Sequence, residues 1–180
     1  LGRAVKDMKT LLNGDKADFG TVQSKLRHAE SVPVWVAAGG PKTLAMAGQY
    51  ADGVVIRVGT HSANIDAALD AITRGALDAG RNPEQITIAA VFHTVMSHDR
   101  AETGHIGRAI AAGYFEYAPY LFDNLALNWD GPTVEVLKQQ VWQDFHHTPD
   151  LVSAGKLVSF LPESAVDDFC LHGGSSDIRT

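Results

Sequence analysis

The sequence predicts an α/β fold built on a parallel sheet, and three observations lead to this prediction. Short apolar runs without polar alternation recur along the chain, as is typical of strands buried on both faces. Between these runs lie segments long enough to form crossover helices. The order is helix, strand, helix, strand, helix, strand, helices, strand, which gives four βα units with right-handed crossovers. Four such units make either half of an eight-stranded (β/α) barrel or a doubly wound open sheet.

The N-terminal region is predicted to form a helix, a loop and the first strand. Apolar residues recur at helical spacing in the first segment: Val5, Met8, Leu11 and Leu12. Gly14 then suits a helix C-terminus, and the polar segment after it predicts a loop in which Phe19 is the single apolar anchor. The stretch "VPVWVAA" at 32–38 predicts a strand buried on both faces.

The next units alternate helices and strands. Pro41 suits the first turn of a helix, and "GVVIRV" at 53–58 predicts the second strand. An amphipathic helix is predicted from Ser62, its N-cap, to Gly80, with a buried stripe formed by Ile65, Leu69, Ile72 and Leu77. "ITIAAVFHTVM" at 86–96 predicts a third buried strand.

The C-terminal part is predicted to be mostly helical before one last strand. Residues 99–165 form a helical insertion with prolines at its internal boundaries, including the segment "PTVEVLKQQVWQDF". The aromatic cluster of this insertion (Tyr114, Phe115, Tyr117, Tyr120 and Phe122) is interpreted as helix packing. "VDDFCLHGG" supplies the last strand. We expect residues 1–180 to form a single domain that contains the insertion.

Composition limits the classes of protein that the sequence can encode. It is 45% hydrophobic and 20% charged, as in a globular domain with a substantial core. The net charge is −6 and the basic residues are scattered, so neither a nucleic-acid nor a membrane surface is predicted. No apolar run is long enough to span a membrane. One cysteine, Cys170, forms no internal disulfide, which favours a cytoplasmic location.

Both ends of the sequence fall within predicted elements. The chain begins without Met, inside a helical pattern, and ends where "GGSSDIRT" starts a new helix. We therefore expect the C-terminal part of a larger protein, or an incomplete sequence. Half a barrel has two exposed sheet edges, which predicts a homo-oligomer or a longer polypeptide.

Every predicted strand ends in permissive or polar residues, on the side where α/β folds place ligands. The first strand is followed by Gly39, Gly40, Pro41 and Lys42. Adjacent glycines before a helix let backbone N–H groups approach an anion, and the helix dipole favours negative charge there. Residues of this type indicate a phosphate cradle, but the same pattern also forms tight strand-to-helix turns that hold no ligand. The residues alone leave both readings open.

Histidines are the other candidates for function. His93 lies near the end of its strand, where it is either a core residue or a residue of a ligand site. His28, His105, His146 and His147 lack metal-ligand spacing and are interpreted as surface residues, so no metal site is predicted. No nucleophile, base and acid with a recognisable context can be identified, and the catalytic residues stay unassigned.

The stretch "VPVWVAAGGPKTLAMAGQYADGVVIRVG" at 32–59 resembles the second half of the luciferase-like flavin-dependent oxidoreductases. The likeness is strongest to the branch that contains methylenetetrahydromethanopterin reductase. Three further segments agree with that family in the same order: "LLNGDKADFGT", "ALDAGRNPEQITIAA" and "FCLHGGSSDI". The family has Thr-Pro in its last turn, where this chain has Ser175 and Ser176.

The resemblance implies the C-terminal half of a (β/α) TIM barrel, with the insertion before its last strand, and a bound coenzyme F420 or FMN. The implied reaction is hydride transfer or monooxygenation on a small organic molecule, with the cofactor supplying the chemistry. The implied cofactor-binding residues are Ala38, Gly39, Gly40, Lys42, Arg57, Val58 and Gly59. His93 and His172 are the candidate substrate-binding residues. A non-catalytic half-barrel that binds a phosphate-bearing ligand, or that acts in oligomer assembly, is the alternative.

Overall fold

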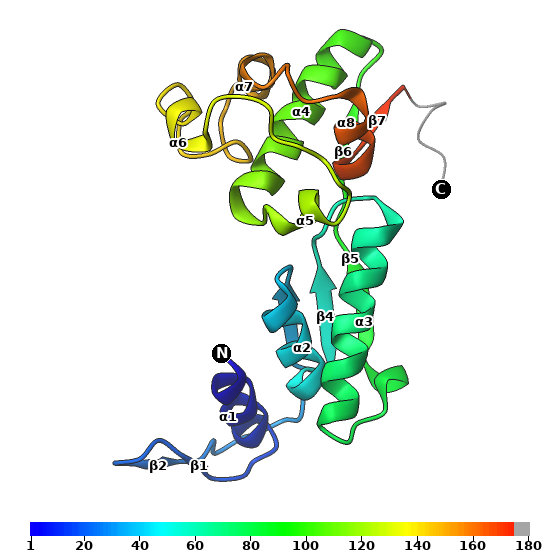
Figure 1. Cartoon of the computed structure of the whole chain (residues 1–180). Coiled ribbons are helices and arrows are strands. Elements are labelled where there is room, and N and C mark those ends of the chain that lie inside the picture. The colour runs from blue at the N-terminus through cyan, green and yellow to red at the C-terminus, as the bar shows by residue number, and fades with distance from the viewer. Residues whose placement is uncertain (175–180) are drawn as a thin grey trace. The chain divides into compact units, whose positions relative to one another are not determined.

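The computed structural model describes residues 1–174, and these residues have the α/β organisation that the sequence predicts. Ser175 and Ser176 lie outside the described residues. The elements are α1 (Gly2–Leu12), β1 (Ala17–Asp18), β2 (Gln23–Ser24), β3 (Trp35–Ala38), α2 (Pro41–Tyr50), β4 (Gly53–Ile56), α3 (Ser62–Asp78), η1 (Pro83–Gln85), β5 (Thr87–Ala90), β6 (His93–Met96), α4 (Arg100–Tyr117), α5 (Tyr120–Asp123), α6 (Val134–Leu137), α7 (Leu151–Leu157), α8 (Glu163–Phe169) and β7 (Cys170–Gly173) (Figure 1).

The chain divides into two compact units. The first unit comprises residues 1–57 and 68–91, and the second comprises 58–67 together with the chain from residue 92 onward. Helix α3 contributes its first turns to the second unit and the rest to the first. The expectation of one domain over the whole chain stays a prediction.

A parallel sheet of three strands forms the centre of the first unit, in the order β3-β4-β5. Its register places Val36 beside Val54 and Ala38 beside Ile56, and all four side chains are buried on one face. Helix α2 packs against β3 and β4 (Figure 1). The parallel arrangement confirms the βα prediction for this region.

The opposite face of this sheet corrects the prediction of a strand buried on both sides. Burial alternates along β3, with Trp35 43% exposed and Ala37 also exposed. The indole of Trp35 lies over Gly53 of the neighbouring strand, where a Cβ would overlap the ring. The apolar run is therefore explained by one helix-covered face and one face on which small residues accommodate a tryptophan.

The predicted third strand, 86–96, is two strands in the structure. Residues of β5 pair with β4 in the first unit, whereas β6 pairs in parallel with β7 in the second. Neither strand is buried as predicted, since Ile88 is 39% exposed and Met96 is 63% exposed. The run divides because its two halves have different partner strands, which the apolar pattern alone does not reveal.

Three further predictions are corrected. Phe19 is 45% exposed, so it is not the buried anchor that was predicted; it lies between the antiparallel strands β1 and β2, in the segment predicted to be a loop. Leu77 is 60% exposed, because the buried stripe of α3 runs through small residues and Ile72. The segment at 132–145, predicted to be helical, forms only the single turn α6.

Glycines bring the helices of the first unit into backbone contact. A Cβ on Gly48 of α2 would overlap the carbonyl oxygen of Ile72, and a Cβ on Gly75 of α3 would overlap that of Ala45. Any larger side chain at these two positions would separate α2 from α3. The position of α2 is therefore set by its packing against α3.

Asp52, just before β4, joins α1 to the sheet. Its carboxylate accepts a hydrogen bond from Lys9 Nζ at 2.5 Å and from the Val34 amide at 2.9 Å. Burial on its own raises the pKa of Asp52, but the bonds from Lys9 and Val34 and the nearby Arg81 lower the pKa overall. The ionised carboxylate is thus the form that stabilises the fold.

We expect Asp52→Asn to lower the free energy of unfolding at pH 7 by about 1 kcal/mol, the usual net value of such hydrogen bonds. Because the pKa of Asp52 is lower in the folded chain than in the unfolded one, this contribution is present at neutral pH and is lost as the pH falls through the folded-state pKa. Urea unfolding at pH 7 and at acid pH measures the difference. An equal effect of the substitution at both pH values would contradict the prediction.

The second unit is organised around the long helix α4. Strands β6 and β7 lie beside it, and α7 and α8 pack along it (Figure 1). Its core contains stacked and edge-on aromatic rings, so the predicted helix packing of the aromatic cluster is confirmed for Phe115 and Phe122. Helix α8 extends to Phe169, which shortens the predicted last strand to the four residues of β7.

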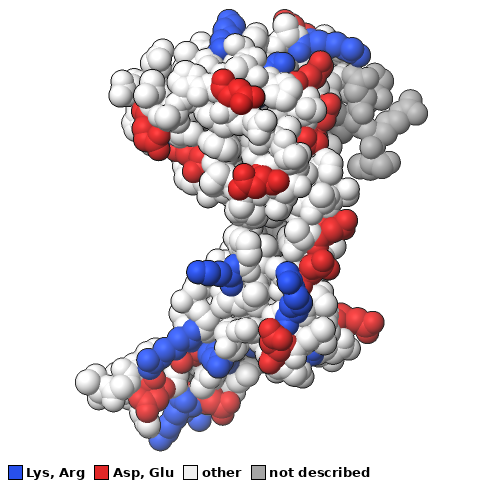
Figure 2. All heavy atoms as spheres, in the orientation of Figure 1, with Lys and Arg blue, Asp and Glu red and all other residues white. Residues whose placement is uncertain are grey.

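Charged residues of both signs are interspersed over the face drawn in Figure 2, and no large patch of one sign stands out there. No helix in the described part of the chain is both long and apolar enough to cross a membrane.

Candidate functional site

The glycine turn connects the end of β3 to the start of α2 in the first unit. Ala38 is buried, and Gly39 follows with its Cβ position 3.2 Å from the carbonyl oxygen of Arg57. Gly40 is the N-cap of α2, and a Cβ there would meet no atom within 4 Å. The turn is therefore tight at Gly39 and open at Gly40.

Helix α2 begins without a side-chain cap, and Pro41 occupies its first turn. Proline lacks an N–H group, so the amides of the following residues are the first donors of the helix. The positive end of the helix dipole lies at the same point. These features match an anion site formed by backbone groups, which is the chemistry predicted from the sequence.

Two cationic side chains accompany this turn in the first unit. Lys42 is exposed in the first turn of α2, and Arg57 is exposed directly after β4. Because β3 and β4 are parallel neighbours with Ala38 opposite Ile56, Arg57 follows β4 at the level where Gly39 follows β3. The structure thus brings together five of the predicted cofactor-binding residues: Ala38, Gly39, Gly40, Lys42 and Arg57.

The other two predicted cofactor-binding residues, Val58 and Gly59, belong to the second unit. Val58 is buried. Gly59 has a φ of 84°, and a Cβ there would lie 2.7 Å from the carbonyl oxygen of Asp168. That oxygen accepts hydrogen bonds from the amides of Thr60 and His61, at 2.8 and 3.1 Å. Gly59 therefore has a structural reason of its own to be glycine, in addition to the predicted role.

His93 lies on β6 with its ring turned toward α4. Its Nδ1 is 3.2 Å from the hydroxyl of Tyr114, and its ring stacks on His146 at 4.9 Å. His146 in turn has Nε2 2.9 Å from the carbonyl oxygen of Ile110. These contacts correct the interpretation of His146 as a surface residue, and they surround His93 with core side chains. Its predicted contact with substrate stays a prediction.

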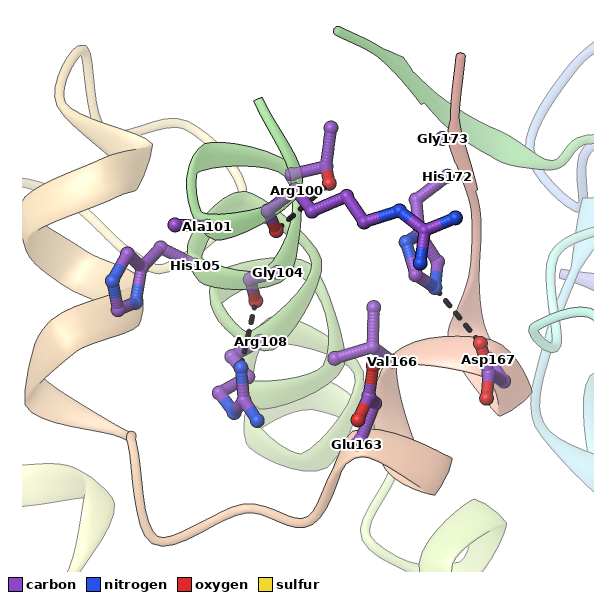
Figure 3. A pocket seen from close by; sticks show the side chains of 11 residues that line it. Arg100, Ala101, Gly104, His105, Arg108, Glu163, Val166, Asp167, His172 and Gly173 are labelled. Atoms are coloured by element: carbon purple, nitrogen blue, oxygen red, sulfur yellow. Dashed lines mark hydrogen bonds and ion pairs between the residues drawn. The ribbon is translucent and has the colours of Figure 1, made fainter. Parts of the chain in front are cut away.

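His172 lies on β7 at the edge of a cavity of about 570 Å³ in the second unit. Its Nε2 is 2.8 Å from a carboxylate oxygen of Asp167 on α8 (Figure 3). Residues of α4 form the opposite wall, among them Arg100 and Arg108. His93 does not line this cavity, so the two histidines predicted to bind substrate occupy different surroundings.

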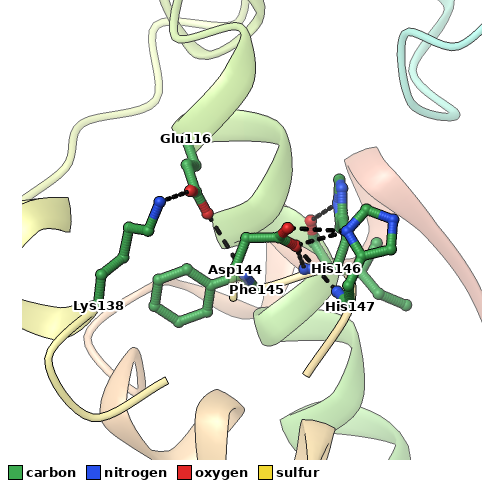
Figure 4. A network of polar contacts seen from close by, with 7 residues as sticks. Glu116, Lys138, Asp144, Phe145, His146 and His147 are labelled. Atoms are coloured by element: carbon green, nitrogen blue, oxygen red, sulfur yellow. Dashed lines mark hydrogen bonds and ion pairs between the residues drawn. The ribbon is translucent and has the colours of Figure 1, made fainter. Parts of the chain in front are cut away.

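A polar network that the sequence does not reveal lies in the insertion (Figure 4). Glu116 on α4 pairs with Lys138 at 2.6 Å, and its second carboxylate oxygen accepts a hydrogen bond from the Phe145 amide at 3.3 Å. Asp144 accepts from the amides of His146 and His147, at 2.8 and 2.9 Å, and from His147 Nδ1. This network fixes the turn between α6 and α7.

No group of three or more His, Cys, Asp or Glu side chains within residues 1–174 is arranged to hold a metal ion. Cys170 is buried, and burial raises the pKa of its thiol to about 12, which keeps the thiol protonated.

The fold and the glycine turn define an α/β protein with a candidate anion site at the carboxyl end of parallel strands. Comparison with known families makes the assignment more specific. Residues 4–179 match the luciferase-like monooxygenase family, and the chain belongs to this family. The resemblance described from the sequence is thereby confirmed.

Two curated relatives illustrate the similarity. The chain is 32% identical over 104 residues to 5,10-methylenetetrahydromethanopterin reductase of Methanolobus tindarius, an alignment that covers 58% of this chain and 31% of that protein. It is 37% identical over 94 residues to F420-dependent glucose-6-phosphate dehydrogenase of Mycolicibacterium fortuitum, covering 48% of this chain and 28% of that protein. Each alignment therefore spans about a third of the relative or less.

Solved structures support the fold. The coenzyme F420-dependent tetrahydromethanopterin reductase of Methanopyrus kandleri superposes with a TM-score of 0.67 at 18% identity, covering 94% of this chain and 50% of that chain. An F420-dependent secondary alcohol dehydrogenase gives a TM-score of 0.57 at 16% identity, covering 95% of this chain and 47% of that chain. The chain thus spans about half the length of these enzymes.

Proposed function

We propose that this chain is part of a luciferase-like oxidoreductase and that its glycine turn holds the phosphate group of coenzyme F420. The observation that carries this proposal is the open turn at Gly40, at the uncapped start of α2. FMN, which also carries a phosphate group, is the other cofactor that the family resemblance implies. The half-barrel architecture is part of the proposal, and it is supported by the coverage of about half of each solved neighbour.

The residues of the turn fit a phosphate group. Gly40 leaves the space above the turn clear of any Cβ, and the first amides of α2 have no side-chain cap to satisfy them. Lys42 adds a flexible positive charge in the first turn of the helix. In this arrangement the backbone supplies directional hydrogen bonds, and the lysine supplies attraction that salt weakens.

When bound, the cofactor supplies hydride chemistry, and the contribution of this chain is to anchor and orient it. Anchoring at a non-reacting phosphate group uses binding energy remote from the reacting atoms to fix the position of the ring. The named relatives reduce or oxidise small organic molecules, which supports a substrate of that general kind. The homo-oligomeric assembly and the cytoplasmic location stay predictions.

We expect Gly40→Val to weaken the binding of F420 by about tenfold or more, because the added side chain occupies the space where the phosphate would lie and removes charge-assisted hydrogen bonds. The backbone of Gly40, with φ −82° and ψ 147°, is allowed for valine, so the fold should be retained. Titrations of F420 and of FMN, followed by fluorescence and absorbance, measure the affinity of both cofactors.

Two controls make this experiment specific. Lys42→Gln should weaken binding mainly at low salt, while Gly104→Ala, in the second unit, should leave binding unchanged. Thermal unfolding of each variant shows that the fold is intact. If the intact chain bound neither cofactor, the proposal would be wrong for this chain alone, and tighter binding of FMN than of F420 would reverse the choice of cofactor.

A further inference from the structure

The cavity of the second unit lies between α4 and α8 and takes no part in the glycine turn. Its volume of about 570 Å³ is large enough for a small organic molecule. Figure 3 shows its polar side chains, which come from α4, α8 and β7. The residues that line it include Arg100, Gly104, Arg108, Glu163, Asp167 and His172.

Three of these residues are spaced by one helical turn each along α4. Arg100, Gly104 and Arg108 therefore lie along one side of the helix, with the glycine between the two arginines. A Cβ on Gly104 would meet only Arg108 Nη1, at 3.3 Å. By contrast, a Cβ on Gly107 would overlap Val166 of α8, so that glycine is needed for helix packing. No such packing contact explains Gly104, whose effect is to leave the space between the arginines open.

Arg108 is held in place by carbonyl groups. Its Nε donates to the carbonyl oxygen of Leu161 at 2.9 Å, and its Nη1 donates to that of Gly104 at 3.3 Å. Neither partner carries a charge, and no carboxylate of the described residues lies within ion-pair distance of this guanidinium. The side chain is therefore oriented by its partners while its charge and its Nη2 donors stay available to a ligand.

Arg100 supplies a second guanidinium. It is exposed at the first turn of α4, and its side chain makes no hydrogen bond or ion pair with any other residue of the described chain. In Figure 3 its side chain extends across the pocket toward His172. Two arginines that face one space are the usual recognition elements for an oxyanion.

Two carboxylates in the cavity limit the negative charge that a bound oxyanion can carry. Asp167 is already engaged by His172, at 2.8 Å, while Glu163 forms no ion pair within the described residues. A dianion such as phosphate would meet repulsion from Glu163, whereas a carboxylate carries a single charge. We propose that this pocket binds a small organic carboxylate, with its oxygens on Arg100 and Arg108.

The proposal is tested on the intact 180-residue chain by NMR titration with acetate, glycolate and inorganic phosphate. We expect acetate and glycolate to shift the Nε–H resonance of Arg108 saturably, with glycolate binding more tightly because its hydroxyl can donate to Glu163. Phosphate should bind more weakly than either. A lack of saturable shifts with both carboxylates, or tighter binding of phosphate, would overturn the proposal.

Variants locate the site. Arg100→Gln should weaken acetate binding by about tenfold, and because Arg100 is exposed and makes no side-chain bond in the described structure, the fold should be intact. Gly104→Leu should abolish binding by filling the gap. Arg74→Gln is the matched control, since Arg74 is a helical arginine that also donates Nε to a backbone carbonyl, that of Asp70. Equal weakening by Arg74→Gln would show that binding is non-specific and would refute the site.

Discussion

Gly155→Ala is expected to destabilise the second unit by about 3 kcal/mol, a cost typical of severe overpacking. A Cβ at Gly155 of α7 would overlap the carbonyl group of His105 on α4, so the two helices meet backbone to backbone. Carbonyl atoms of a helix cannot rotate away as a side chain can, and the helices would have to separate. Urea unfolding monitored by circular dichroism measures the change.

The same substitution at Gly104 is the control. Its Cβ would contact only the end of the flexible Arg108 side chain, and alanine has a higher helix propensity than glycine. We therefore expect Gly104→Ala to be neutral or to stabilise the chain by up to about 1 kcal/mol. If both variants lost stability equally, the backbone contact between α4 and α7 would not be the cause.

Asp144→Asn is expected to lower the free energy of unfolding by about 2 to 3 kcal/mol at pH 7, because a buried acceptor of several hydrogen bonds is replaced by a group that satisfies fewer of them. Asp144 is only 8% exposed. Burial alone raises the pKa of its carboxyl, but hydrogen bonds from Tyr117, from His147 and from two backbone amides hold the pKa well below its usual range. The ionised form is thus strongly favoured in the folded chain.

The direction of the pKa shift of Asp144 determines how the effect of Asp144→Asn on the free energy of unfolding depends on pH. Since the folded-state pKa of Asp144 lies below its unfolded value of about 4, the carboxylate contributes its full stabilisation above that pH. The contribution declines as the pH falls below about 4, so the difference between wild type and Asp144→Asn should shrink in acid. Unfolding curves at pH 7 and pH 3 test this. The exposed Asp78→Asn is the control, and a difference that did not change with pH would contradict the assignment.

Much of the first unit could be predicted from local sequence. Pro41 marks the start of α2, and the glycine pair before it lies at the predicted turn between strand and helix. Gly80 has a φ of 68° and follows α3, as a C-terminal glycine should. These features are local because a proline or a left-handed glycine acts on the backbone within one or two residues.

Features that depend on distant partners were not predictable in the same way. The run at 86–96 is mostly apolar along its whole length, and only its pairing with β4 and then with β7 divides it. Arg100 and Arg108 have no recognisable motif, because their shared cavity exists only once α8 packs beside α4. The buried role of Asp144 likewise depends on local amides and on Tyr117, none of which the helical spacing of its segment indicates.

The contact of Gly48 with Ile72 lies far from the glycine turn, so a small change in the tilt of α2 at this contact would displace the start of the helix. Gly48 is seven residues from Pro41, which corresponds to roughly 10 Å along the helix. A tilt of about 5° about this contact would move the start of the helix by roughly 1 Å. This displacement exceeds the ~0.5 Å within which the groups of a well-organised site are held in position. The accuracy with which Gly39 and Gly40 could hold a phosphate is therefore set toward the other end of α2, where Gly48 and Gly75 let the backbones of two helices touch.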